Sequence, residues 1–165
     1  ASMNEPKVLG LLDHIHATDA ALGALGGRQG STLDIRNFGL MMAREHDALQ
    51  RDARALAEGL RLTPQKPVTA PDEAPATFRA NVDSSPAGAA WDLAYVEYAI
   101  AEHEAAMENT ARALAATRSP AVRDYVRKSV PILQKHLDKA RSLQQTLVKA
   151  QPARTSTAPA PQSPR

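Results

Sequence analysis

The sequence predicts an all-α protein built as a four-helix bundle, and three observations favour this fold. Apolar residues recur at spacings of three and four along four long stretches, the period of a helix with one buried face. Two short breaks and one proline-rich segment separate these stretches. Alanine is abundant while aromatic residues make up 4 % of the chain, which suits closely packed helices. The 165 residues are enough for one domain with a single core.

The first two helices are predicted over residues 5–29 and 33–62. Gly30 suits the position that follows a helix C-terminus, and Ser31 or Thr32 can cap the second helix. The connection is short, so we expect two antiparallel neighbours. The inward face of the first helix is marked by Val8, Leu12, Ile15, Leu22 and Gly26.

The other two helices are predicted over residues 87–117 and 120–150. Ser119 followed by Pro120 is an N-cap with proline at the first helical position. Pro131 lies inside the last helix and predicts a kink or bulge one turn before His136. Both helices alternate spacings of three and four on their apolar side, which is typical of a bundle seam.

The remaining segments lack a helical pattern. Residues 63–86 carry five prolines and no sustained period, so we expect an irregular linker, either a long crossover or an excursion from the bundle. This leaves the topology open between up-down-up-down and a crossover arrangement. Residues 151–165, rich in proline, alanine, serine and threonine, are predicted to be a disordered tail. The bundle domain therefore spans 1–150.

Composition excludes several function classes. The 20 Lys+Arg against 18 Asp+Glu give a net charge of only +2, with interleaved signs, so nucleic acid is not an expected partner. Because there is no cysteine, disulfides, thiolate metal sites and cysteine nucleophiles are excluded. No apolar run approaches the ~18 residues of a membrane span.

Four polar residues lie on the predicted core faces. His46 occupies the apolar stripe of the second helix, and His103 and His136 occupy seam positions of the third and fourth helices. In the first helix Asp19 lies within about 20° of Val8 on the helical wheel. Burying an unpaired imidazole costs a few kcal/mol, so these rings should have a partner.

The heights of these residues can be compared by counting from the helix caps. Asp19 and His46 lie 13 and 14 residues from Thr32, and the two histidines of the second hairpin lie 16 and 17 residues from Ser119. If the second hairpin overhangs the first by about three residues, or roughly 4.5 Å, all four share one layer.

Such a layer is a ligand set for one divalent transition metal ion. Imidazole suits Zn, Cu, Fe and Ni, and a carboxylate offsets their charge. The predicted ligands are His46, His103, His136 and Asp19. Residues near them are candidate extra ligands or hydrogen-bond partners of the ligands: Glu45, Glu102, His16, Met42 and Met107. We expect both methionines at the same end of the bundle, where thioethers would favour copper(I).

Three stretches resemble an exported bacterial family of unknown function: "ALGALGGRQGSTLDIRNFGLMMAREHDAL" (21–49), "WDLAYVEYAIAEHEAAM" (91–107) and "SPAVRDYVRKSVPILQKHLDKARSL" (119–143). Members are labelled "predicted outer membrane protein" and assigned to the ferritin-like superfamily. The resemblance rests on Phe-x₃-Met-x₃-His, on Ala-Tyr followed by His, and on Pro-x₄-His-Leu. It implies a ferritin-like bundle, a preceding signal peptide or lipoprotein leader, and a periplasmic or envelope location. It supports the three histidines as family positions, whereas "TDAALG" departs from the "AEIELG"-like run of relatives and leaves Asp19 as the sole carboxylate.

Two further interpretations stay open beside a metal-binding protein without catalytic activity. In the first, the histidines are structural, with Asp19 bonded to one ring, and the protein is a non-catalytic envelope interaction module that meets a partner through its linker or tail. In the second, it is an oxidoreductase that uses the metal, which requires an open coordination position. The sequence has no phosphate loop, nucleophile elbow or HExxH motif, so no catalytic residue is predicted. It also lacks the Glu-x-x-His pairs of di-iron bundles.

Overall fold

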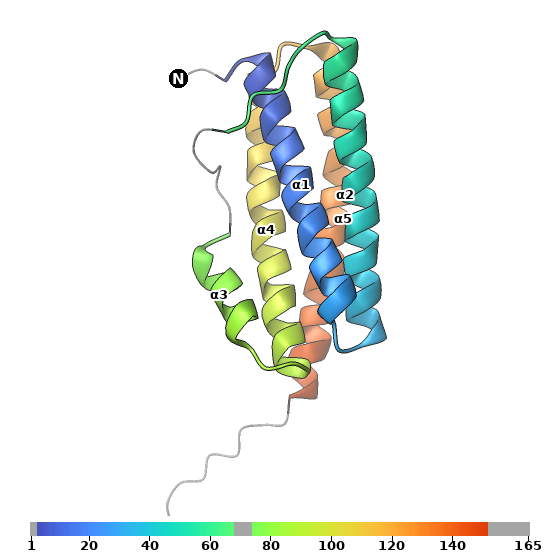
Figure 1. Ribbon diagram of the computed structural model, residues 1–165, viewed down its shortest axis with the longest axis vertical. Helices are drawn as coiled ribbons and strands as arrows, with labels where there is room; N and C mark the ends of the chain where they lie inside the picture. The colour runs from blue at the N-terminus through green and yellow to red at the C-terminus, as the bar shows by residue number, and fades with distance from the viewer. Residues whose placement is uncertain (1–2, 68–73, 152–165) are drawn as a thin grey trace, which may run out of the picture.

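The structure is a computed structural model that describes residues 3–67 and 74–151 (Figure 1). Within these ranges the chain is helical and contains no strand, which confirms the predicted fold class. The helices, in chain order, are α1 Glu5–Gln29, α2 Leu33–Gly59, α3 Ala76–Ser84, α4 Ala89–Ala116 and α5 Pro120–Ala150. No helix in the described ranges has both the length and the apolar character that crossing a membrane requires.

Side chains cap the helices where the sequence indicates. The Thr32 hydroxyl accepts a hydrogen bond from the Ile35 N–H, and the Ser119 hydroxyl accepts one from the Val122 N–H. The second helix ends three residues earlier than predicted, at Gly59. The reason is local, because Arg61 has a φ of 56° and the Leu62 N–H bonds back to the Ala57 carbonyl, which closes the helix.

The two long hairpins, α1–α2 and α4–α5, lie head to tail, so their turns are at opposite ends of the bundle (Figure 1). Hydrogen bonds fix this arrangement. The Ser31 N–H and hydroxyl of the first turn donate to the Asp92 carboxylate at the start of α4, at 2.9 and 2.5 Å. At the other end, the Glu5 carboxylate accepts from the Thr117 hydroxyl and the N–H groups of Arg118 and Ser119.

The segment between α2 and α4 therefore runs the length of the bundle, which makes the topology a crossover. Its first part is held at α1, where the Gln65 N–H donates to the Pro6 carbonyl at 2.8 Å. The prediction of an irregular linker over 63–86 is wrong for its second half, since α3 lies there and packs against α4. Only Val82 of α3 is buried, and one buried residue leaves no helical period in the sequence.

The core consists of two hydrophobic clusters, one toward each end of the bundle. The first uses α1 up to Ile15 and α4 from Ala106, and the second uses α1 from Leu22 and α4 up to Ala99. The same division holds in α2 and α5. A gap of about two turns therefore separates the clusters in every long helix, and buried polar residues fill it.

Candidate metal centre

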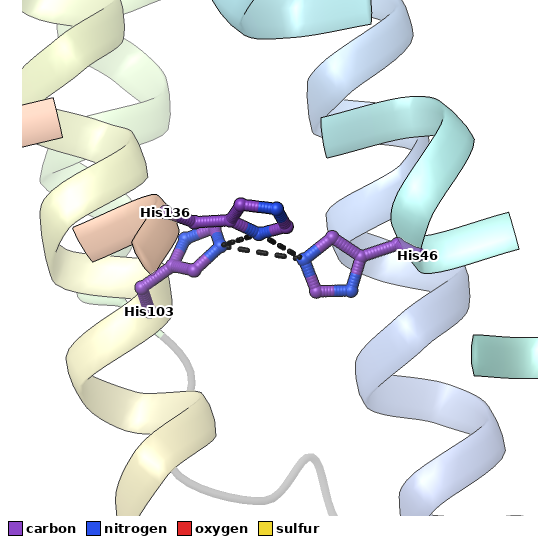
Figure 2. Close-up of side chains that lie close together, drawn as sticks. All are labelled: His46, His103 and His136. Atoms are coloured by element: carbon purple, nitrogen blue, oxygen red, sulfur yellow. Dashed lines mark hydrogen bonds between the residues drawn. The ribbon is translucent and has the colours of Figure 1, made fainter. Parts of the chain in front are cut away.

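Three histidines from three helices meet in the polar layer between the two clusters. His46 of α2, His103 of α4 and His136 of α5 are all 0 % exposed. His46 Nε2 lies 3.0 Å from His136 Nδ1 and 3.3 Å from His103 Nε2, and the latter two atoms are 3.3 Å apart. Figure 2 shows these nitrogens pointing at one another. The prediction that these three rings converge is confirmed.

The spacing of these nitrogens fits a tetrahedral metal site. Metal–imidazole bonds of about 2.0–2.1 Å in a regular tetrahedron place neighbouring ligand atoms about 3.3–3.4 Å apart. The three observed separations of 3.0 to 3.3 Å lie close to this edge length. The three histidines are thus positioned to hold one metal ion.

Two of the rings are oriented by hydrogen bonds on their outer nitrogens. His103 Nδ1–H donates to the Ala99 carbonyl at 2.9 Å, and His136 Nε2–H donates to Glu45 Oε2 at 2.6 Å. Because a neutral imidazole carries one hydrogen, the inward nitrogens of both rings carry lone pairs. Metal-ligating histidines are held in this way by partners on the nitrogen that faces away from the metal.

Asp19 lies beside this centre but not within it. Its Oδ2 is 3.7 Å from His46 Nε2, and the carboxylate is not one of the groups whose ligand atoms all lie within 4.8 Å of one another. Asp19 is 1 % exposed, and Oδ2 has no hydrogen-bond partner among the described residues. Burial raises the pKa of Asp19 to about 7. The aspartate therefore approaches one of the three rings instead of meeting all of them.

The layer arises in a different way from the one the sequence suggested. Since the hairpin turns are at opposite ends, an overhang of the second hairpin plays no part. The residues are level because each lies near the middle of its helix, between the two core clusters. For the same reason the expectation about the methionines is wrong: Met42 belongs to the cluster at one end, and Met107 packs against the cluster at the other.

The remaining candidates occupy different positions around the centre. His16 of α1 is 0 % exposed, and its Nδ1 lies 3.1 Å from His46 Nδ1. Glu45, a candidate extra ligand or hydrogen-bond partner of the ligands, accepts a hydrogen bond from the His136 ring and another from Lys135. Burial tends to raise the pKa of Glu45, but these two hydrogen bonds outweigh it and lower the pKa below its usual value. Glu102 is buried. The pKa of Tyr98 is raised mainly by burial and further by the nearby Glu102 carboxylate.

Electrostatics keep the imidazoles neutral. Burial lowers the pKa values of His16, His103 and His136 to about 4. The pKa of His46 is lowered further by two causes. Burial is the larger, and the neighbouring imidazole rings also disfavour a positive charge there. Neutral imidazole is the form that binds metal. The arrangement therefore places three inward nitrogens of neutral rings and one nearby carboxylate in a site closed to solvent.

Comparisons with known proteins agree with the fold and name no activity. A family model described as "Domain of unknown function (DUF4142)" matches residues 1–143, and no curated protein matches the sequence. One solved structure, "Crystal structure of DUF305 fragment from Deinococcus radiodurans", is similar with a TM-score of 0.65 and 18 % identity, covering 86 % of this chain and 95 % of that one. Identity this low supports a shared fold alone. Because the family model spans most of the sequence, the chain belongs to the DUF4142 family of domains of unknown function.

Proposed function

We propose that this protein binds one transition metal ion in the middle of its bundle, through His46, His103 and His136. The observation that carries the proposal is the triangle of inward nitrogens, 3.0 to 3.3 Å apart, drawn from three helices. Two of these nitrogens carry lone pairs that face each other, so an ion would replace a repulsive contact with two bonds. The family model and the structural likeness support the fold and leave the function open.

Asp19 is the proposed source of negative charge for the bound ion. Its Oδ2, which has no hydrogen-bond partner among the described residues, lies 3.7 Å from His46 Nε2, the nitrogen that faces the centre. A divalent ion nearby favours the ionised form of a carboxylate, so the buried acid would lose its proton when metal binds. Zinc, copper and iron all accept imidazole and carboxylate together. A role in metal handling or stress response would follow from such a site.

The test uses untagged protein purified without a chelating column, so that every ion comes from the fold itself. We expect close to one equivalent of bound metal after dialysis against Zn²⁺, Cu²⁺ or Fe²⁺. Free metal at about 100 times Kd stabilises a protein by about 2.7 kcal/mol, which raises the Tm of a chain of this size by about 5–10 °C. His103→Leu should abolish both effects.

A matched control separates ligand loss from general damage to the core. Thr110 is also buried in α4, and its Oγ1 has no hydrogen-bond partner among the described residues, so Thr110→Val removes a buried polar group outside the centre. This variant should bind metal as the unchanged protein does. Less than about a tenth of an equivalent in the unchanged protein, with no thermal shift for any of the three ions, would falsify the proposal.

We also propose that the protein acts in the periplasm or cell envelope and has a ferritin-like architecture. The resemblance of its three histidine-bearing stretches to an exported family supports both points, and the crossover between α2 and α4 is compatible with the second. Cell fractionation of the native protein in its own host tests the location. Recovery in the cytoplasmic fraction would contradict it.

A further inference from the structure

A fourth buried imidazole, His16 of α1, contacts the proposed metal centre from outside. It is 0 % exposed, and its Nδ1 is 3.1 Å from Nδ1 of His46, the nitrogen that faces away from the centre. The two ring centroids are 5.4 Å apart. The other nitrogen of His16, Nε2, is buried and has no hydrogen-bond partner among the described residues. Among the described residues, the hydrogen-bond partner of the His16 ring is therefore His46, through Nδ1.

When no metal is bound, the surrounding acceptors decide where each hydrogen lies. The inward nitrogens of His103 and His136 carry lone pairs, because their outer N–H groups donate to the Ala99 carbonyl and the Glu45 carboxylate. His46 Nε2 contacts both lone pairs, at 3.3 and 3.0 Å, so it must carry the hydrogen of a neutral ring.

The same rule then fixes the hydrogen of the outer bond. His46 Nδ1 is an acceptor in the empty centre, since its ring already carries a hydrogen on Nε2. His16 Nδ1 must therefore be the donor across the 3.1 Å contact. Every hydrogen of the four rings is thus assigned with each ring neutral, and His16 Nε2 keeps a lone pair that no residue in the described ranges bonds.

A metal ion would reverse this outer bond. All three inward nitrogens must then present lone pairs, so His46 has to carry its hydrogen on Nδ1 and donate it toward His16. His16 accepts on Nδ1 and carries its own hydrogen on Nε2. In sum, His46 Nε2 gives one proton to solvent, His16 Nδ1 passes one to His46 Nδ1, and His16 Nε2 takes one from solvent, so each ring stays neutral.

We propose that His16 is a positioning residue of the metal centre, which donates to His46 when the centre is empty and accepts from it when metal is bound. This inference rests on the proposed metal-binding function. Groups that fix the outer nitrogen of a ligating histidine typically contribute 10- to 100-fold to metal affinity. His16 would contribute in this way, and without metal its Nδ1–H still bonds to His46 Nδ1.

Nitrogen-15 NMR of the imidazole rings, in untagged protein with and without Zn²⁺, tests the assignment directly. In the empty protein we expect hydrogens on His46 Nε2 and His16 Nδ1. Zn²⁺ should move both, to His46 Nδ1 and His16 Nε2. A hydrogen that stays on the same nitrogen of His16 in both samples would overturn the proposal.

Three variants give an independent measurement, the Zn²⁺ dissociation constant from competition with a chromophoric chelator. His16→Leu should bind at least about ten-fold more weakly, while His16→Gln, whose amide can donate or accept, should stay within about three-fold of the unchanged protein. Thr110→Val is the control for loss of a buried polar group and should bind normally. Equal affinity of His16→Leu and the unchanged protein, or no recovery in His16→Gln, contradicts the positioning role.

The failures of the two proposals are distinguishable. If the unchanged protein binds no Zn²⁺, the proposed metal function is lost, and the NMR spectra of the empty protein still decide the His16–His46 bond. If Zn²⁺ binds but the ring hydrogens do not move, the metal function stands and the role of His16 is rejected. Should His16→Leu fail to fold, as judged by circular dichroism, the spectra of the unchanged protein carry the test.

Discussion

Lowering the pH of the metal-free protein should destabilise it through its buried imidazoles, and His103 allows the effect to be calculated. The ring is 0 % exposed, and burial lowers its pKa from 6.5 to about 4. A group whose pKa is lower in the folded chain binds fewer protons there than in the unfolded chain, in the range between the two values. The contribution of His103 to the free energy of unfolding is therefore fully present above pH 6.5 and is lost as the pH drops toward 4.

The magnitude follows from the two pKa values. At pH 5 the unfolded ring is almost fully protonated, whereas about a tenth of the folded rings are. Between pH 8 and pH 5 this difference removes about 2 kcal/mol of unfolding free energy for this one ring. Asp19 acts in the opposite direction, because its raised pKa makes the folded chain bind more protons than the unfolded chain below pH 7. The total pH dependence therefore mixes both signs.

A single substitution isolates the contribution of His103. In His103→Asn the amide N–H can replace the donor to the Ala99 carbonyl, but the side chain does not titrate. Urea unfolding in the presence of a chelator, at several pH values from 8 to 5, gives the free energy of each protein. We expect the variant to lose about 2 kcal/mol less than the unchanged protein over this range. A constant difference between the two proteins would refute the assignment of His103 as a buried neutral ring.

Three further predictions concern the packing that holds the layer in place. Asp92→Ala removes the buried carboxylate that binds Ser31 and should cost about 1.5–3 kcal/mol in urea unfolding, while no loss would show that this contact does not stabilise the bundle. Gly39→Ala places a Cβ 2.5 Å from backbone atoms of α1, so we expect the free energy of unfolding to fall by about 1–3 kcal/mol. In the matched control Gly59→Ala the new Cβ meets no atom within 4 Å, and the variant should be more stable by about 0.5–1 kcal/mol. Equal effects of the two substitutions would be inconsistent with close contact between α1 and α2. Thr110→Val replaces a buried hydroxyl without a partner in the described structure, and should leave Tm unchanged or raise it; a fall of several degrees would show that the hydroxyl is bonded.

The helices could be predicted from the sequence because their signals are local. The bounds of α1 and α5 agree with the prediction to the residue. Gly30 directly follows α1, and the Ser119–Pro120 pair supplies the N-cap and the first residue of α5. The early end of α2 and the presence of α3 could not be predicted in this way. Arg61 takes a left-handed conformation that its residue type does not favour, and α3 depends on the contact of Val82 with the bundle.

The candidate site, too, could be predicted from the sequence only in part. Helical periodicity alone placed His46, His103 and His136 on inward faces, because the face a residue occupies depends only on the geometry of its own helix. The convergence of their nitrogens, the position of Asp19 beside a single ring and the bond from His16 to His46 depend on how four helices lie relative to one another. The sequence by itself determined that imidazoles would be buried. Only the tertiary structure, with its hairpins head to tail, decided which nitrogen meets which, since contacts between helices depend on their relative height and direction and not on any local pattern.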